Sequence, residues 1–180
     1  MKNGALDLYA GFWKRATAFA LDYVIIALYL ATLTLISLLL NSFFGVAQWL
    51  FSDRVRAQLS GFLLITLPIT LYFAFSESSH RRATWGKAKV RVQVTDYHGE
   101  RIGFWRSLAR TALKFVPWEL SHTLIWQITF FPMNSPAWVN YGFVLVYGLI
   151  GLNLAGILFT KQHQSIYDLL AKTYVIKLRR

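Results

Sequence analysis

Apolar residues dominate four stretches of the chain, and their lengths suit helices that cross a membrane. The longest stretch covers residues 16–40, where Asp22 is the only ionisable side chain. Three more stretches follow at residues 59–75, 111–131 and 139–159. A bilayer core about 30 Å thick needs about 20 helical residues to cross it. The pattern therefore predicts an all-α membrane protein with about four transmembrane helices in a bundle.

The two central stretches are the least regular of the four. Residues 59–75 form a short run with Pro68 inside it, so a re-entrant segment is the alternative to a full crossing. Residues 111–131 contain Glu119 and His122, which suits a span that begins later than the apolar run does. A protein with three spans is therefore the alternative to one with four.

Between the second and third stretches the spacing changes to that of a strand. Val90, Val92 and Val94 alternate with polar residues, and the turn-forming sequence Asp-Tyr-His-Gly follows at residues 96–99. This pattern predicts a small cytoplasmic β-hairpin over about residues 86–103. The strand-like residues 173–178 either join this hairpin or lie at the membrane interface.

Two further segments have the pattern of short amphipathic helices at the membrane interface. One covers residues 104–112 and leads into the third span. The other covers residues 165–172, where Ser165 suits the N-cap and Asp168 lies in the first turn, close to the positive end of the helix dipole. Asp168 is therefore explained either as a helix-end charge or as part of a functional site.

Composition agrees with a membrane protein and removes several classes of chemistry. The chain of 180 residues is 56% hydrophobic, with a mean hydropathy of +0.41. It has no cysteine, which excludes disulfides, thiolate catalysis and cysteine-bound metals. Its sequence has no phosphate-binding loop and no nucleophile motif, so we expect neither an enzyme nor a cofactor. We expect a single domain over residues 1–180.

Basic residues are distributed unevenly around the predicted spans. With both termini in the cytoplasm, four spans place sixteen Lys and Arg residues inside and two outside, while Lys114 lies within the third span. This agrees with the positive-inside tendency and predicts a multi-pass protein of the cell (inner) membrane. Because the basic residues cluster beside the spans, we expect anionic lipid headgroups as the partner and no nucleic acid. The candidates for contact with lipid or a protein partner are Arg81, Arg82, Lys87 and Lys89.

Arg15 and Asp22 share one face of the first predicted helix without touching. Their spacing of seven residues corresponds to about 10 Å along the helix axis. Helical side chains lean toward the N-terminus, so Arg15 is expected to point to the headgroups, away from Asp22. A charge as deep as Asp22 is costly unless it is paired, protonated or hydrated, so its partner is expected on another helix. Glu119 and His122 are the predicted partners, forming either a structural network or a site for ions or protons. Further candidates are Arg110 and Lys114, lower on the same segment, and Tyr147 and Asn153 in the fourth span.

The sequence also contains two Glu-x-x-His pairs, Glu77 with His80 and Glu119 with His122. This spacing places two metal-capable side chains on one helix face, as in the di-metal carboxylate sites of helical bundles. However, Glu77 is expected to lie nearer the membrane surface than Glu119. A metal site is therefore a distant alternative.

Three charged residues and their surroundings resemble a known family. Arg15 at the start of the first span, Asp22 within it and Asp168 in SIYDLLAKTYVI look like the RDD family of integral membrane proteins. The segment TWGKAKVRVQVTDYHGERI is similar to that family's stretch of Thr, Gly-Lys, a valine-rich segment, Asp and Gly. Members commonly carry a His just before the second Asp, where this chain has Tyr167. The resemblance implies an integral membrane protein and suggests ion transport.

We therefore predict ion transport by cation/proton exchange, with Asp22, Glu119 and His122 binding a proton or a monovalent cation. The alternative is a membrane scaffold that binds lipid or a protein partner through its basic cytoplasmic face. A chain with four spans is small for a transport path, so transport would rest on a homo-oligomer. Small residues that suit either self-association or packing within one chain are Gly148, Gly151, Ala155 and Gly156.

Overall fold

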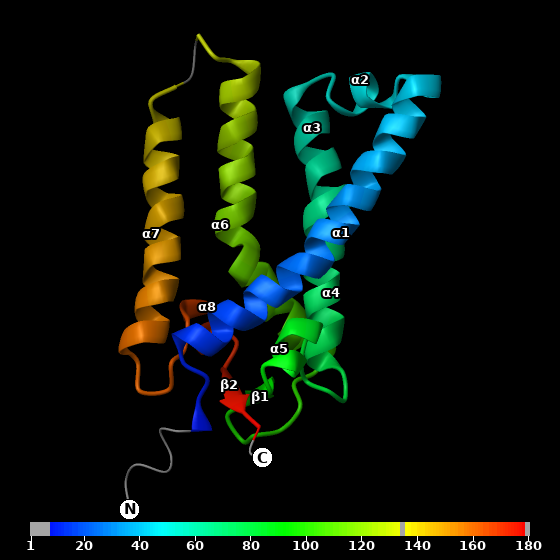
Figure 1. The fold of residues 1–180 in the computed structure, drawn as a ribbon. Coiled ribbons are helices and arrows are strands. Elements are labelled where there is room, and N and C mark those ends of the chain that lie inside the picture. Colours follow the sequence, from blue (N-terminus) through cyan, green and yellow to red (C-terminus); the bar gives the residue numbers. More distant parts are fainter. Residues whose placement is uncertain (1–7, 134–135, 179–180) are drawn as a thin grey trace, which may run out of the picture.

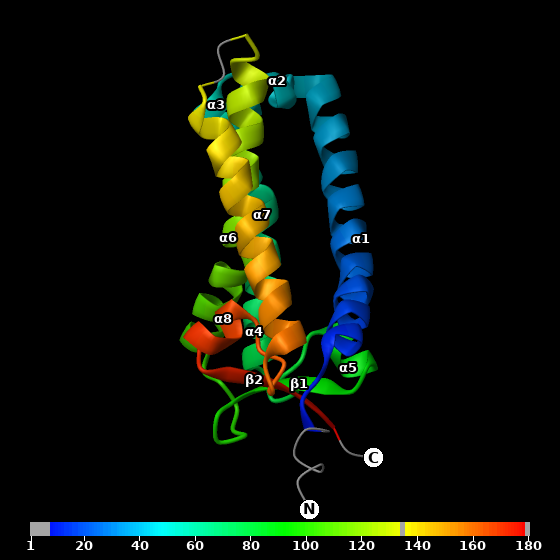
Figure 2. The same ribbon diagram turned by 90° about the vertical axis from the view of Figure 1, so that its left-hand side faces the viewer.

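The structure is a computed structural model that describes residues 8–133 and 136–178. Three helical rods stand nearly parallel, and the N-terminal helix crosses them at a slant (Figure 1). A small sheet and two short helices gather at one end of the rods, the end where the first long helix begins (Figure 2). The helices are α1 (Phe12–Phe44), α2 (Val46–Leu50), α3 (Arg54–Gly61), the π-helix η2 (Phe62–Thr66), α4 (Leu67–Ser78), α5 (Trp85–Lys89), α6 (Phe104–Phe130), α7 (Trp138–Phe159) and α8 (Ile166–Leu170).

Three of the described helices are long and apolar enough to cross a bilayer. They are α1, the continuous rod Arg54–Ser78 formed by α3, η2 and α4, and α7. Large apolar side chains point outward from them, as Leu28 and Val144 do with exposed fractions of 65% and 70%. Such surfaces suit contact with lipid, because acyl chains take the place of water around them. The membrane character predicted from the sequence is therefore confirmed, and a fourth crossing by α6 stays a prediction.

The helices are longer than the apolar stretches that predicted them. The stretch at 16–40 lies within Phe12–Phe44, and the stretch at 59–75 lies within the rod Arg54–Ser78. Polar or charged residues border the apolar runs inside the helices, so the runs are shorter than the helices. Inside the second rod, η2 widens one turn, and the hydroxyl of Tyr29 on α1 donates a 2.5 Å hydrogen bond to the carbonyl of Leu64 there.

The predicted interfacial helix at 104–112 and the predicted span at 111–131 form one continuous helix, α6. Pro117 lies inside it, and a proline there removes a backbone hydrogen bond and clashes with the preceding turn. Figure 1 shows the resulting bend in α6, below which the helix turns toward α5. Before the bend, the polar side chains of Ser107, Arg110 and Thr111 are buried.

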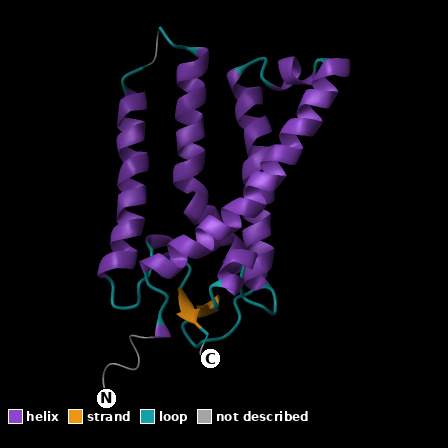
Figure 3. Ribbon diagram, viewed as in Figure 1, coloured by secondary structure: helices purple, strands orange, loops and turns teal. Residues whose placement is uncertain are grey.

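The sheet corrects the predicted hairpin at 86–103. Strand β1 (Val92–Asp96) is confirmed, but it pairs antiparallel with β2 (Thr173–Lys177), and residues Trp85–Lys89 form α5 (Figure 3). Asp96 still makes the expected turn, accepting hydrogen bonds from the amides of residues 98 and 100. The distant partner is favoured because Val94 lies opposite Val175, and both are buried in a small core.

Helix α8 confirms the short helix predicted at 165–172. Ser165 accepts a hydrogen bond from the Asp168 amide, and the Asp168 carboxylate accepts one from the Ser165 amide, which completes a capping box.

Packing within the chain accounts for Gly156 of α7, where an added Cβ would lie 2.5 Å from the Gln164 carbonyl oxygen.

Candidate functional site

Asp22 is buried in α1 and is bound by three neutral donors. Its carboxylate accepts hydrogen bonds from the Tyr72 hydroxyl at 3.0 Å, the Thr84 hydroxyl at 2.6 Å and the Gly86 amide at 2.7 Å. Thr84 is also the N-cap of α5, accepting a hydrogen bond from the amide of Lys87. Asp22 therefore fixes α4 and the start of α5 against α1. This agrees with the expectation that its partner lies on another element.

Gly86 makes this contact sterically possible. A Cβ at this position would lie 2.1 Å from the carbonyl oxygen of Ala18 and 2.9 Å from Cγ of Asp22. Only a residue without a side chain lets the backbone approach α1 so closely.

Arg15 and Asp168, which are far apart in the sequence, form a buried ion pair. The Arg15 Nη1 atom lies 2.6 Å from Oδ2 of Asp168, 153 residues later. Sequence reasoning expected Arg15 to point to the headgroups, and this was wrong, because α8 places the carboxylate of Asp168 within hydrogen-bond distance of Arg15. Asp168 is thus both the helix-end charge that was predicted and an ion-pair partner.

Arg110 links Asp168 to a second carboxylate. Its guanidinium lies 2.6 Å from Asp168 and 2.6 Å from Glu77, and Glu77 also binds the ammonium of Lys87. Burial opposes ionisation of Asp168, yet Arg110 and Arg15 together hold the pKa of that carboxyl below its usual range. Burial lowers the pKa of Lys87, and the attraction of Glu77 opposes this.

Sequence reasoning missed Arg110 as the centre of this network. It placed Arg110 on the polar side of the interfacial helix and among the candidate partners of Asp22, because the continuity of α6 was not visible in the sequence. The available signal was a pair of carboxylates near predicted spans, Glu77 just after the second apolar stretch and Asp168 in the first turn of the helix predicted at 165–172.

Glu119 lies in a separate network, nearer the other end of the helices. Its carboxylate accepts hydrogen bonds from Gln58 Nε2 at 2.9 Å and from the hydroxyl of Thr66, and His122 Nδ1 lies 3.9 Å away. The structure does not bring Asp22 together with Glu119 and His122. Asp22 lies near the sheet end of α1, whereas Glu119 follows the bend in α6 and faces α3 and η2.

The two Glu-x-x-His pairs do not converge on a metal site. Glu77 is bound by Lys87 and Arg110, and His80 lies beyond the end of α4 with its side chain exposed. Within residues 8–133 and 136–178, no group of three or more His, Asp and Glu side chains could hold a metal ion.

The four basic residues expected to contact lipid or a partner separate into two groups. Lys87 turns inward to Glu77, and Arg82 donates a 2.7 Å hydrogen bond to the Gly99 carbonyl oxygen. Arg81 and Lys89 are exposed at the sheet end.

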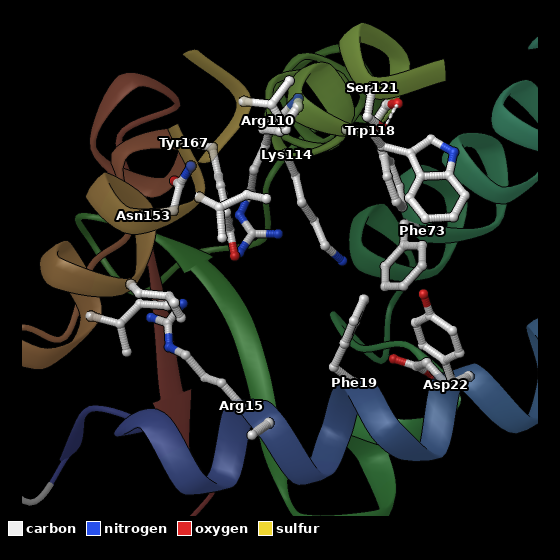
Figure 4. A pocket seen from close by; sticks show the side chains of 18 of the residues that line it. Arg15, Phe19, Asp22, Phe73, Arg110, Lys114, Trp118, Ser121, Asn153 and Tyr167 are labelled. Atoms are coloured by element: carbon white, nitrogen blue, oxygen red, sulfur yellow. Dashed lines mark hydrogen bonds between the residues drawn. The ribbon is translucent and has the colours of Figure 1, made fainter. Parts of the chain in front are cut away.

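A cavity of about 670 Å³ lies between α1, α4, α6 and α7. Figure 4 shows the side chain of Lys114 pointing into it, with Arg15, Arg110 and Tyr167 on one side and Phe19, Phe73 and Asp22 on the other. The sequence indicated Lys114 as a charge inside a span and a candidate partner of Asp22, and its position over the cavity depends on the bend in α6.

Comparison with known proteins gives one finding about the whole chain. A model of the RDD family matches residues 9–172. No curated protein matches the chain. No solved structure matches it either.

Proposed function

The chain belongs to the RDD family, and we propose that it transports ions, exchanging a monovalent cation for a proton at Glu119. The observation that carries the proposal is the set of neutral partners around this carboxylate. Glu77 and Asp168 are each bound by two cations, whereas Glu119 is bound by an amide and a hydroxyl. A carboxylate with neutral partners in a membrane-length helix can bind a proton or a cation in turn.

The surroundings of Glu119 provide oxygen ligands for a cation. Thr66 is buried beside it, and Oε1 of Gln58 is a buried acceptor without a hydrogen-bond partner among the described residues. Turning the Gln58 amide over would present this oxygen to a bound cation in place of the donating Nε2. Oxygen atoms of this kind are the ligands that hard cations prefer.

His122 is a second proton-binding group beside the carboxylate. Its Nδ1 lies 3.9 Å from the carboxylate of Glu119. Protonation of His122 would repel a cation from Glu119, and deprotonation would release that repulsion. Proton uptake and cation release are thereby coupled at one site.

Asp22 has a structural role in this proposal. Its three donors already satisfy both carboxylate oxygens, and they join α1 to α4 and α5. In the proposed topology α6 is the fourth span, both termini are cytoplasmic and the sheet lies at the cytoplasmic surface of the cell membrane. Exposed Arg81 and Lys89 would then contact anionic headgroups.

The test is proton flux driven by a cation gradient in liposomes that contain the purified protein. We expect flux from the wild-type chain and at least a tenfold lower rate from Glu119→Gln. Glu100→Gln, which removes an exposed carboxylate from the turn after β1, is the matched control and should leave the rate unchanged. Absence of flux from folded wild-type protein with every monovalent cation, or wild-type flux from Glu119→Gln, would refute the proposal.

A further inference from the structure

The cavity beside Lys114 has features of a binding site that are independent of Glu119. We propose that it binds an amphiphilic anion, the phosphate headgroup of an acidic lipid, with its acyl chain lying between α6 and α7. Lys114 would be the principal contact of the phosphate, and Arg15 would assist it.

The ammonium of Lys114 is surrounded by aromatic rings and has no hydrogen-bonding partner in the described part of the chain. Within residues 8–133 and 136–178 its ammonium makes no hydrogen bond and no ion pair, although it borders the cavity. Its nitrogen lies 3.6 Å from the ring centre of Phe73 and 4.7 Å from that of Phe19. Aromatic faces attract a cation but accept no conventional hydrogen bond, so an anionic oxygen would be a stronger partner.

Arg15 provides a second unused donor at the same cavity. Its Nη1 binds Asp168 and its Nε binds the carbonyl oxygen of Ala10, but Nη2 is buried without a hydrogen-bond partner in the described structure. Buried donors without a partner are unusual in native proteins, because each keeps the cost of losing water. Nη2 has almost no exposed surface, so a rotation of the Arg15 side chain would bring this donor to an oxygen in the cavity.

The charges around the cavity favour an anion over a cation. Four cationic side chains border it, those of Arg15, Lys87, Arg110 and Lys114. The carboxylates Glu77 and Asp168 are each shared by two of the first three cations, and Asp22 is bound by neutral donors. The four cations therefore outnumber the three carboxylates, and Lys114 is the cation that contacts no carboxylate.

The remaining wall explains why the anion should carry an apolar chain. Ile125 of α6 and Val146 and Ile150 of α7 continue the cavity away from the cations. Ile125 and Ile150 keep exposed fractions of 48% and 43%, so this wall opens to the surroundings of the helices. In a bilayer those surroundings are acyl chains, and the cations lie at the sheet end, where headgroups would be. A phospholipid matches this order of polar and apolar contacts.

The experiment is a calorimetric titration of the full chain in neutral detergent. The probes are dihexanoyl phosphatidate, dihexanoyl phosphatidylcholine and inorganic phosphate. We expect phosphatidate to bind at least tenfold more tightly than either of the other two. Equal affinity for inorganic phosphate would refute the role of the acyl chain, and equal affinity for phosphatidylcholine would refute the role of the exposed phosphate charge.

Variants locate the site. Lys114→Met should weaken phosphatidate binding at least tenfold, and Lys114→Arg should restore most of it. Lys161→Met removes an exposed charge beyond the end of α7 and should bind as the wild type does. Ile150→Trp keeps every charge but fills the apolar wall, so it should also weaken binding. The proposal would be refuted if the Lys114→Met variant unfolds at the wild-type temperature and still binds phosphatidate with wild-type affinity. This outcome does not depend on the flux measured for Glu119→Gln.

Discussion

The amide of Gly86 donates a 2.7 Å hydrogen bond to the carboxylate of Asp22, which lies 64 residues earlier in the chain. This contact joins α5, which lies outside the predicted spans, to the N-terminal half of α1. It also requires glycine, because a Cβ would meet the carbonyl oxygen of Ala18. A backbone carbonyl cannot rotate away as a flexible side chain can.

Replacing Gly86 with alanine should therefore destabilise the fold. The added Cβ would lie 2.1 Å from the Ala18 carbonyl oxygen, so α5 must move and lengthen the bonds to Asp22. We expect a loss of about 1–3 kcal/mol in the free energy of unfolding, the usual cost of overpacking. Thermal unfolding in detergent measures it.

Gly61→Ala is the control for this change. Gly61 ends α3, has helical backbone angles, and a Cβ there would have no neighbour within 4 Å. Because alanine is a better helix former, this variant should be as stable as the wild type or more stable. If Gly86→Ala lowers the free energy of unfolding no more than Gly61→Ala does, the close approach of Gly86 to Ala18 is contradicted.

Asp22→Asn should affect stability and leave transport per folded molecule nearly unchanged. The asparagine keeps one acceptor oxygen but turns an NH2 group toward donors, so at least one hydrogen bond is lost. The expected cost is about 1–3 kcal/mol. Denaturation curves and flux normalised to folded protein separate this outcome from that of Glu119→Gln. Loss of flux from fully folded Asp22→Asn would return Asp22 to the transport site.

Asp168 should make stability depend on pH in the acid range. Its pKa is lowered in the folded state, where the nearby Arg110 and Arg15 outweigh the effect of burial. The unfolded carboxyl therefore takes up its proton first as pH falls, and stability rises with pH through that range. The contribution is complete above the unfolded pKa of about 3.9 and is lost progressively below it.

Asp168→Asn removes this dependence and leaves Arg110 and Arg15 without one shared carboxylate. Breaking a buried ion pair from one side costs about 3–5 kcal/mol at neutral pH. Unfolding followed from pH 7 to 3 should show a smaller loss of stability in the variant than in the wild type. Parallel curves for the two proteins would contradict the assignment.

Hydrophobic periodicity and helix-capping residues predicted where the helices lie along the chain. They predicted the contacts between the helices less well. The apolar stretches located the long helices, and Ser165 with Asp168 located α8. The same reasoning established that Asp22 needed a partner on another element. It could not identify the three donors, because the packing of α4 and the start of α5 against α1 is not contained in any local pattern.

The candidate sites depended on geometry that no local pattern contains. The bend at Pro117 sets where Lys114 and Glu119 lie, and η2 turns Thr66 toward Glu119. The Glu-x-x-His spacing at Glu77 was real, but α4 ends at Ser78, so His80 leaves the helix face. Spacing on a helix is informative only while the helix continues.

The pairing of β1 with β2 gives the last prediction, because it distinguishes the observed sheet from a local hairpin. Val175 is buried opposite Val94, whereas Leu178 is exposed after the end of β2. Val175→Ala should cost about 1–2.5 kcal/mol, and Leu178→Ala should change stability by less than about 0.5 kcal/mol. Thermal unfolding of both variants makes the comparison. If residues 86–103 formed a local hairpin instead, Val175 would not be part of a buried core. Neither substitution would then change the free energy of unfolding.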